Sequence, residues 1–178
     1  MALHTKVALV DEVLDAHAAD LGPDMEGYRN HVYRVLNLCL ALSPVATDRD
    51  KVAVAAVFHD LGIWTDGTFD YLGPSVAQAE KYLAATGRIE WAPEIAATIL
   101  EHHKISPYRA NPAWVVEAFR RADWIDVSMG TIGYGLQQNV IRGVREYWPS
   151  AGFHRRLVSL SFERLRSHPL SPLPMVRW

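Results

Sequence analysis

The sequence predicts an all-α fold, a bundle of about seven or eight helices. Apolar residues recur three and four positions apart along most of the chain, which is the spacing of the buried face of a helix. Helix start and stop signals separate these stretches, and no stretch shows sustained alternation of apolar and polar residues. The expected helices lie, in chain order, at about residues 7–22, 28–43, 48–60, 74–86, 93–102, 112–123, 136–147 and 153–167.

Capping residues and prolines set the expected ends of several helices. Thr47 is expected to cap the third helix, with Asp50 reaching back to it as in a capping box. Proline fits the first turn of a helix, so three helices are expected to begin at prolines, namely Pro74, Pro93 and Pro112. Pro44 and Gly87 are expected to end the helices that precede them.

Two stretches lie outside the expected helices. Residues 64–73 form the longest irregular connection, and loops of this length in compact domains are often functional. Three aromatic side chains in this loop could form a pocket wall or only pack the loop itself: Trp64, Phe69 and Tyr71. Residues 168–174 contain three prolines and are expected to pack as an extended tail. The C-terminal helices and this tail together occupy about residues 135–178.

Composition and charge are typical of one compact domain, expected to comprise residues 1–178. This length suffices for a single core, and 49% of the residues are apolar. No uncharged stretch approaches the roughly 20 residues of a membrane span, and the N-terminus has no secretion-signal pattern. A single cysteine, Cys39, excludes an internal disulfide, so we expect a cytoplasmic protein without membrane association. The net charge of −2 argues against a broad nucleic-acid surface.

The dipeptide His59-Asp60 is the strongest chemical signal in the chain. It directly follows the apolar stretch 52–58 and precedes Leu61-Gly62, so it is expected at the inner end of a core helix. Buried titratable groups cost free energy unless they are paired or bind a metal. One nitrogen donor and one oxygen donor at this position therefore indicate metal chemistry.

Further nitrogen and oxygen donors occur in a particular order along the chain. His31 precedes the His59-Asp60 dipeptide, the pair His102-His103 follows it, and Asp123 comes last, after Ala122. This order resembles the HD-domain superfamily of metal-dependent phosphohydrolases, and the resemblance covers about residues 25–130. It implies a single HD-like helical bundle.

The resemblance also implies four ligands for a divalent metal ion: His31, His59, Asp60 and Asp123. Two imidazoles and two carboxylates suit Mn²⁺, Fe²⁺, Co²⁺, Ni²⁺ or Zn²⁺ better than a soft metal such as Cu⁺. Such an ion can activate water and polarise a phosphoryl oxygen. Taken singly, His31 could be a core histidine and Asp123 part of a surface ion pair. Asp126 lies one turn after Asp123, but the Ala-Asp context favours Asp123, which leaves Asp126 beside the ligands or on the surface.

One position departs from the pattern of the superfamily. Ser75 stands where the resemblance would place a histidine of a second metal site, which favours one ion over two. His102 and His103 are then expected to contact substrate or to transfer a proton, since imidazole titrates near neutral pH. Adjacent helical residues point about 100° apart, so one of the two rings is expected to face the site, and the sequence does not choose between them.

Four more residues are candidates for catalysis or substrate binding. Asp66 could orient the water or protonate a leaving group, and Tyr28 could line the pocket. Arg34 and Lys104 could neutralise phosphoryl oxygens, which need countercharge. The simpler explanations are turn formation for Asp66 and solvated surface charge for the two cations.

These residues favour a metal-dependent hydrolase of a small phosphate ester, such as a nucleotide. Two alternatives stay open. The first is an HD-type enzyme of another reaction class, either a diiron oxygenase or a small-nitrile hydratase. The second is a non-catalytic HD scaffold that binds a ligand. In each case the expected partner is a small molecule, and a homo-oligomer is compatible with the sequence.

Overall fold

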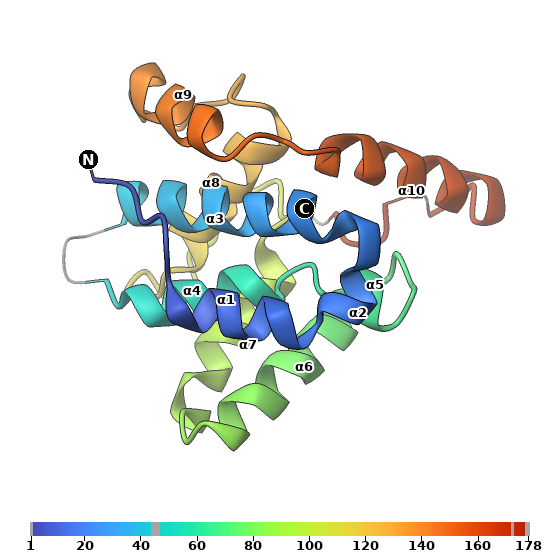
Figure 1. Ribbon diagram of the computed structural model, residues 1–178, viewed down its shortest axis with the longest axis horizontal. Coiled ribbons are helices and arrows are strands. Elements are labelled where there is room, and N and C mark those ends of the chain that lie inside the picture. The colour runs from blue at the N-terminus through green and yellow to red at the C-terminus, as the bar shows by residue number, and fades with distance from the viewer. Residues whose placement is uncertain (1, 44–46, 172, 177–178) are drawn as a thin grey trace.

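The computed structural model describes residues 2–43, 47–171 and 173–176. They form ten α-helices and two short 3₁₀ helices, and no β-strand is assigned within them (Figure 1). Eight of these α-helices have nine or more residues, so the predicted all-α bundle is confirmed. The elements are α1 (Ala8–Ala16), α2 (Ala18–Leu21), η1 (Gly22–Asp24), α3 (Met25–Leu42), α4 (Arg49–Phe58), α5 (Gly62–Thr65), α6 (Leu72–Ala85), η2 (Ile89–Trp91), α7 (Ala92–Glu101), α8 (Val116–Val127), α9 (Gln138–Tyr147) and α10 (Phe153–Ser167).

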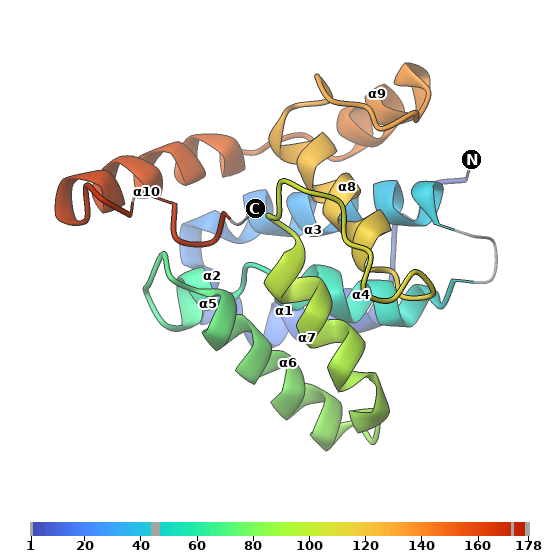
Figure 2. The ribbon, with the colours of Figure 1, turned by 180° about the vertical axis from the view of Figure 1, so that it is seen from behind.

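Helix α3 forms the centre of the bundle. It packs against α8, α4 and α9, and both views of the ribbon show it between α9 and α10 on one side and α1 and α4 on the other (Figures 1 and 2). Residues 30–39 are all buried, so this helix presents its whole circumference to the protein interior. The polar residues of this stretch must therefore find partners inside the core.

Helix α4 carries the chain through the core to the His59-Asp60 dipeptide. Residues 52–58 are all buried, and the helix packs against α1, α3, α6 and α7. Small side chains dominate this stretch, which lets four helices approach it closely. His59 is the first residue after the helix, so the dipeptide enters the interior at a helix end.

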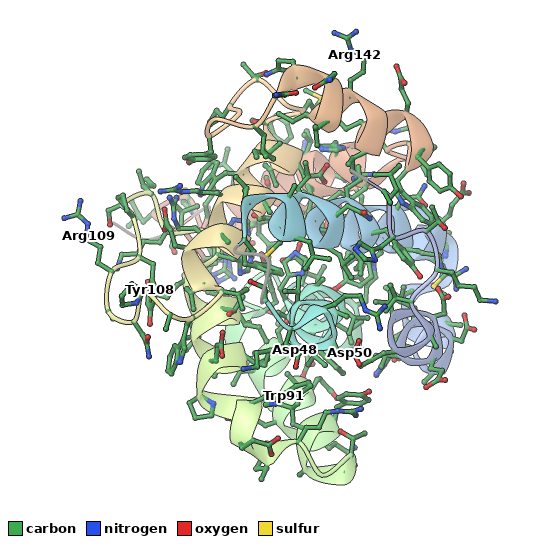
Figure 3. The ribbon with its side chains drawn as sticks, turned by 90° about the vertical axis from the view of Figure 1, so that its left-hand side faces the viewer. Asp48, Asp50, Trp91, Tyr108, Arg109 and Arg142 are labelled. Atoms are coloured by element: carbon green, nitrogen blue, oxygen red, sulfur yellow. The ribbon has the colours of Figure 1, made fainter. Side chains whose placement is uncertain are left out.

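The cap of α4 differs by one residue from the prediction. The N-cap is Asp48, whose carboxylate accepts hydrogen bonds from the backbone N–H groups of Asp50 and Lys51. The Asp50 carboxylate pairs with Arg49 at 2.9 Å instead of reaching back, and both aspartates lie at the start of α4 in Figure 3. The predicted capping box with Thr47 at its head is wrong, because an extended Asp48 satisfies the free N–H groups directly.

Helix α8 begins at Val116, four residues after the predicted start at Pro112. The Asn111 side chain accepts a hydrogen bond from the Ala113 N–H group, and residues 112–114 form a turn. The Val115 N–H group donates to a carboxylate oxygen of Glu94, on α7. Because these side chains accept hydrogen bonds from the backbone N–H groups, the helix begins later than predicted.

Other helix ends lie close to their predicted positions. Helix α6 begins at Leu72, two residues before Pro74, and the first predicted helix is divided at His17 into α1 and α2. Gly87 follows the end of α6 with a φ of +70°, the left-handed conformation that glycine adopts without strain. The predicted stop at Pro44 lies outside the described residues.

One irregular stretch follows α5 and another follows α10. Helix α5 takes up Trp64 and Thr65, so the loop expected at residues 64–73 is reduced to 66–71. After α10 the chain turns back along that helix (Figure 2), and its described residues contain turns but no helix. Met175 in this tail is only 4% exposed. None of the described helices is long and apolar enough to cross a membrane.

Ser75 and Gly62 fix the chain directly after the His59-Asp60 dipeptide. Ser75 is fully buried, and its hydroxyl oxygen accepts a hydrogen bond of 3.0 Å from the Gly62 N–H group. A Cβ atom on Gly62 would lie 2.7 Å from the Tyr71 carbonyl oxygen and 3.0 Å from the Ser75 nitrogen. Helices α5 and α6 therefore meet at a distance that only glycine allows.

We expect Gly62→Ala to lower the free energy of unfolding by about 1–3 kcal/mol, because the added methyl group overpacks this contact. Urea unfolding followed by circular dichroism measures the change. Gly73→Ala is the matched control, since a Cβ atom there meets open space. Equal stability of the two variants would contradict the close contact.

Candidate metal centre

Four helices bring five titratable side chains to one point in the core. His31 comes from α3, His59 and Asp60 from the end of α4, His102 from the end of α7 and Asp123 from α8. Each of these side chains is at most 2% exposed. The cluster is therefore shielded from bulk water, and its members must interact with one another.

The Nε2 atoms of His31 and His59 lie within 4 Å of each other and of one carboxylate oxygen each of Asp60 and Asp123. The Nε2 atom of His31 is 2.9 Å from His59 Nε2, 3.5 Å from Asp60 Oδ2 and 3.7 Å from Asp123 Oδ1. The Nε2 atom of His59 lies 3.5 Å from the same Asp60 oxygen and 3.8 Å from the same Asp123 oxygen. Two nitrogen atoms and two oxygen atoms thus surround one small volume.

Hydrogen bonds on the far side of the rings fix the tautomers of His59 and His102. The Nδ1 atom of His59 lies 2.7 Å from the Ala56 carbonyl oxygen, and that of His102 lies 2.7 Å from the Ile99 carbonyl oxygen. A carbonyl oxygen only accepts, so each Nδ1 carries the hydrogen. In the neutral rings, both Nε2 atoms then present a lone pair to the cluster.

His31 is oriented in the same way by Asp126. Its Nδ1 atom lies 2.7 Å from Asp126 Oδ2, so Nδ1–H donates and Nε2 faces His59. Two lone pairs at 2.9 Å repel each other unless a cation lies between them. That cation is a proton or a metal ion.

Several atoms of the cluster have no hydrogen-bond partner among the described residues. These atoms are Asp60 Oδ1, His102 Nε2 and both carboxylate oxygens of Asp123. A buried polar atom without a partner costs about 1–3 kcal/mol, so this concentration of unpaired acceptors requires a compensating positive charge. A divalent metal ion fits the site, since all the donors are nitrogen or oxygen.

Burial and mutual charge shift the pKa values of the cluster in opposite directions. Burial lowers the pKa of His59 to about 3. Burial also opposes the charged form of His31, but Asp126 and Asp60 outweigh it and raise the His31 pKa to about 9. Burial raises the pKa of Asp123 to about 7, whereas the three neighbouring histidines hold the pKa of Asp60 well below its usual range despite its burial.

Arg34 lies behind His31 and does not face the cluster. Its guanidinium donates to both carboxylate oxygens of Asp126 and, at 3.0 Å each, to the carbonyl oxygens of Trp148 and Pro149. It is 1% exposed. Most of its N–H groups therefore hold Asp126 and the chain before α10, and this geometry gives no support to the predicted role of Arg34 in substrate binding.

Both members of the histidine pair face the cluster, which corrects the expectation that only one would. His102 Nε2 lies 3.3 Å from Asp60 Oδ1, and His103 Nδ1 lies 3.4 Å from Asp123 Oδ2. Helix α7 ends at Glu101, so the helical angle of 100° does not apply to the two rings. Asp60, His102 and His103 form a second group of donors close enough to hold an ion.

Three other predicted residues do not face the cluster. Asp66 is exposed and accepts a hydrogen bond from the Thr65 hydroxyl. The Lys104 ammonium group pairs with Glu101 at 3.2 Å. Tyr28 is buried beside His31, but its hydroxyl donates to the Val57 carbonyl oxygen, which uses its only hydrogen. None of the three described side chains hydrogen-bonds to the cluster, and their predicted substrate and catalytic contacts stay predictions.

A cavity of about 360 Å³ reaches the cluster at Asp60 and His103. Phe69 and Tyr71 line it from the loop before α6, Trp124 and Met129 from α8 and the residues after it, and Met175 from the C-terminal tail. Trp64 is not part of this wall; its indole N–H donates to Asp24. The sequence indicated the loop aromatics, whereas the role of the tail was missed, although apolar residues among its prolines signal burial.

No curated protein and no solved structure shows significant similarity to the chain. The family model for the HD domain matches residues 28–128, and this range includes every side chain of the cluster and most of the core around it. With more than half of its length matched and its donors gathered from the ends and faces of four helices, the chain belongs to the HD-domain family.

Proposed function

We propose that the protein is a metal-dependent hydrolase of a small phosphate ester, with one divalent ion held by four side chains: His31, His59, Asp60 and Asp123. The observation that carries the proposal is the set of buried nitrogen and oxygen atoms that face one another without partners. The HD-domain family consists mostly of metal-dependent hydrolases, which agrees with this assignment. Mn²⁺, Fe²⁺, Co²⁺, Ni²⁺ and Zn²⁺ are the ions that this donor set suits.

A bound divalent ion would supply an acidified water molecule and would polarise the reacting group of the substrate. Asp126 and the carbonyl oxygens of Ala56 and Ile99 hold the three inner imidazoles in the orientation described above. His103 lines the cavity and also lies beside Asp123 of the cluster, and its Nε2 atom lies 2.7 Å from the Tyr71 hydroxyl. We assign to His103 the transfer of a proton between the cavity and the cluster.

A second candidate is the hydration of a small uncharged substrate such as a nitrile. It is favoured by the lining of the cavity, where no lysine or arginine is found among the described residues. Asp60 and Asp123 would balance a divalent ion, so a phosphate dianion would meet no further positive charge. Arg34 and Lys104, which were expected to supply it, are engaged elsewhere.

Asp60→Ala should abolish metal binding while the helical circular dichroism signal is largely kept, because both Asp60 oxygens face the cluster. Elemental analysis of the purified protein measures the metal, with one equivalent expected in the wild type. Asp70→Ala, a change at an exposed loop residue, is the control and should keep its metal. A metal-replete Asp60→Ala variant would show that the site is wrongly assigned. Two equivalents in the wild type would assign a second ion to Asp60, His102 and His103.

Metal binding should release protons and should strengthen as the pH rises from 6 to 9. In the metal-free protein His31, with a pKa of about 9, holds a proton throughout most of this range, and Asp123, with a pKa of about 7, holds one in its lower part. A metal ion has to displace both, so about one to two protons should leave at pH 7. Calorimetric titration with Mn²⁺ in two buffers of different ionisation enthalpy measures them. Identical heats in both buffers would contradict the competition.

The reaction class is tested with a panel of nucleotides, aryl and alkyl phosphates, and small nitriles, each offered to Mn²⁺- and Co²⁺-loaded protein. Release of phosphate or alcohol from an ester supports the phosphohydrolase. Amide formed from a nitrile supports the second candidate instead. Oxygen consumption by an iron-loaded protein with two equivalents of metal would replace both with the oxygenase. If the fully metal-loaded protein turns over no compound of the panel, the non-catalytic HD scaffold is the hypothesis that remains.

A further inference from the structure

The cavity beside the metal centre has an apolar wall built from separate parts of the chain. Phe69 and Tyr71 come from the loop before α6, Trp124 from α8, Val158 from α10 and Met175 from the C-terminal tail. Its volume of about 360 Å³ lies within the range of about 300–1,000 Å³ typical of small-molecule sites. Aromatic and aliphatic side chains thus surround a space directly next to Asp60 and His103.

The polar groups in this wall already have partners inside the protein. The Trp124 indole N–H donates to the Lys104 carbonyl oxygen, and the Ser161 hydroxyl donates to the Leu157 carbonyl oxygen at 2.8 Å. His154 has both ring nitrogens engaged, one with the Ser150 hydroxyl and one with the Asp126 carbonyl oxygen. The Tyr71 hydroxyl is paired with His103.

A bound molecule would therefore find few hydrogen bonds in the cavity away from the metal centre. No lysine or arginine is among the described residues that line the cavity. Lys104 pairs with Glu101, and Arg109 points outward from its loop (Figure 3). A nucleoside carries ribose hydroxyls and base nitrogens that would lose their water without gaining partners here. An apolar group has no hydrogen bonds to water to lose, and the burial of its surface favours binding.

We propose that this cavity binds the non-reacting part of the substrate and that this part is an uncharged aryl or branched alkyl group, not a nucleoside. The inference rests on the proposed function only in placing the reacting group at the metal centre. The preference for an apolar body follows from the cavity wall itself. It narrows the expected phosphate esters to those of apolar alcohols, and it applies equally to an uncharged substrate.

Binding of N-phenyl-1-naphthylamine, an uncharged fluorophore, tests the cavity without any turnover. We expect saturable fluorescence enhancement, both after metal removal with EDTA and after loading with Mn²⁺. Naphthalene should displace the fluorophore, and adenosine at the same concentration should not. Displacement by adenosine as effective as that by naphthalene, or no saturable binding, would overturn the proposal. Whether the proposed metal site is correct is tested separately, by the metal content of the purified protein.

Two pairs of variants on α10 place the fluorophore in the cavity. Val158 and Phe162 are both about half exposed, at 55% and 61%, but only Val158 lines the cavity. Val158→Asp should weaken binding by at least about tenfold, because its carboxylate would have to lose water when the apolar ligand enters. Phe162→Asp should change binding by less than about twofold, being outside the cavity. Equal losses in both would show that the fluorophore binds the outer face of α10, which overturns the proposal.

The second pair fills the cavity instead of charging it. Ser161 lines the cavity, whereas Ser159 is exposed on another face of α10. Ser161→Phe should weaken fluorophore binding by at least about tenfold by occupying the space, and Ser159→Phe should leave it unchanged. If Val158→Asp does not fold, this pair alone decides, and unchanged binding in Ser161→Phe would overturn the proposal. Circular dichroism of each variant establishes that it is folded.

Discussion

Two imidazole nitrogens that face each other across 2.9 Å in a buried core are the constraint on which the rest of this structure depends. Hydrogen bonds on the outer side of the rings direct the Nε2 atoms of His31 and His59 inward, so a positive charge has to lie between them. Asp60 and Asp123 surround that charge with negative groups. Leaving such a cluster uncompensated would cost several kcal/mol per ion. The same arrangement that would be unstable without a positive charge is therefore suited to hold a divalent metal ion.

The ends of two helices, α4 and α7, position two of the imidazoles in this arrangement. His59 and His102 each follow the last residue of a helix, and each donates its Nδ1 hydrogen to a carbonyl oxygen three residues earlier. These carbonyl groups belong to the last turn, where a helix leaves acceptors without intrahelical partners. One hydrogen bond therefore caps the helix and fixes the tautomer of the ring. His31 and Asp123 reach the same point from the middle of α3 and α8, which pack against each other.

The order of donors predicted the helical bundle and the residues that meet in its core, because residue type and helical spacing are local properties of a sequence. The direction in which a long side chain points its donors depends instead on residues that are distant in the sequence. Arg34 was expected at a phosphate, yet its partners lie 92 to 115 residues away, at Asp126 and before α10. Only one ring of the His102-His103 pair was expected to face the site, but α7 ends at Glu101, one residue before the predicted end, so the helical angle between adjacent residues does not apply to the two rings. The cavity wall depends on the return of the C-terminal tail, and no pattern near His59-Asp60 predicts that contact.

The position of Arg34 links the stability of the cluster to the character of the cavity. Asp126 keeps its negative charge in the core because His31 donates a hydrogen bond to it and Arg34 pairs with it, and the charged Asp126 in turn orients His31. The same guanidinium does not line the cavity, and both N–H groups of its Nη1 atom hold the Trp148 and Pro149 carbonyl oxygens. The two negative charges of Asp60 and Asp123 would balance the two positive charges of a divalent ion held by these residues. Because the buried Arg34 holds Asp126, and through it His31, in place, the cavity can be lined with aromatic and aliphatic side chains, and the preference for uncharged groups that we propose follows from how the cluster is stabilised.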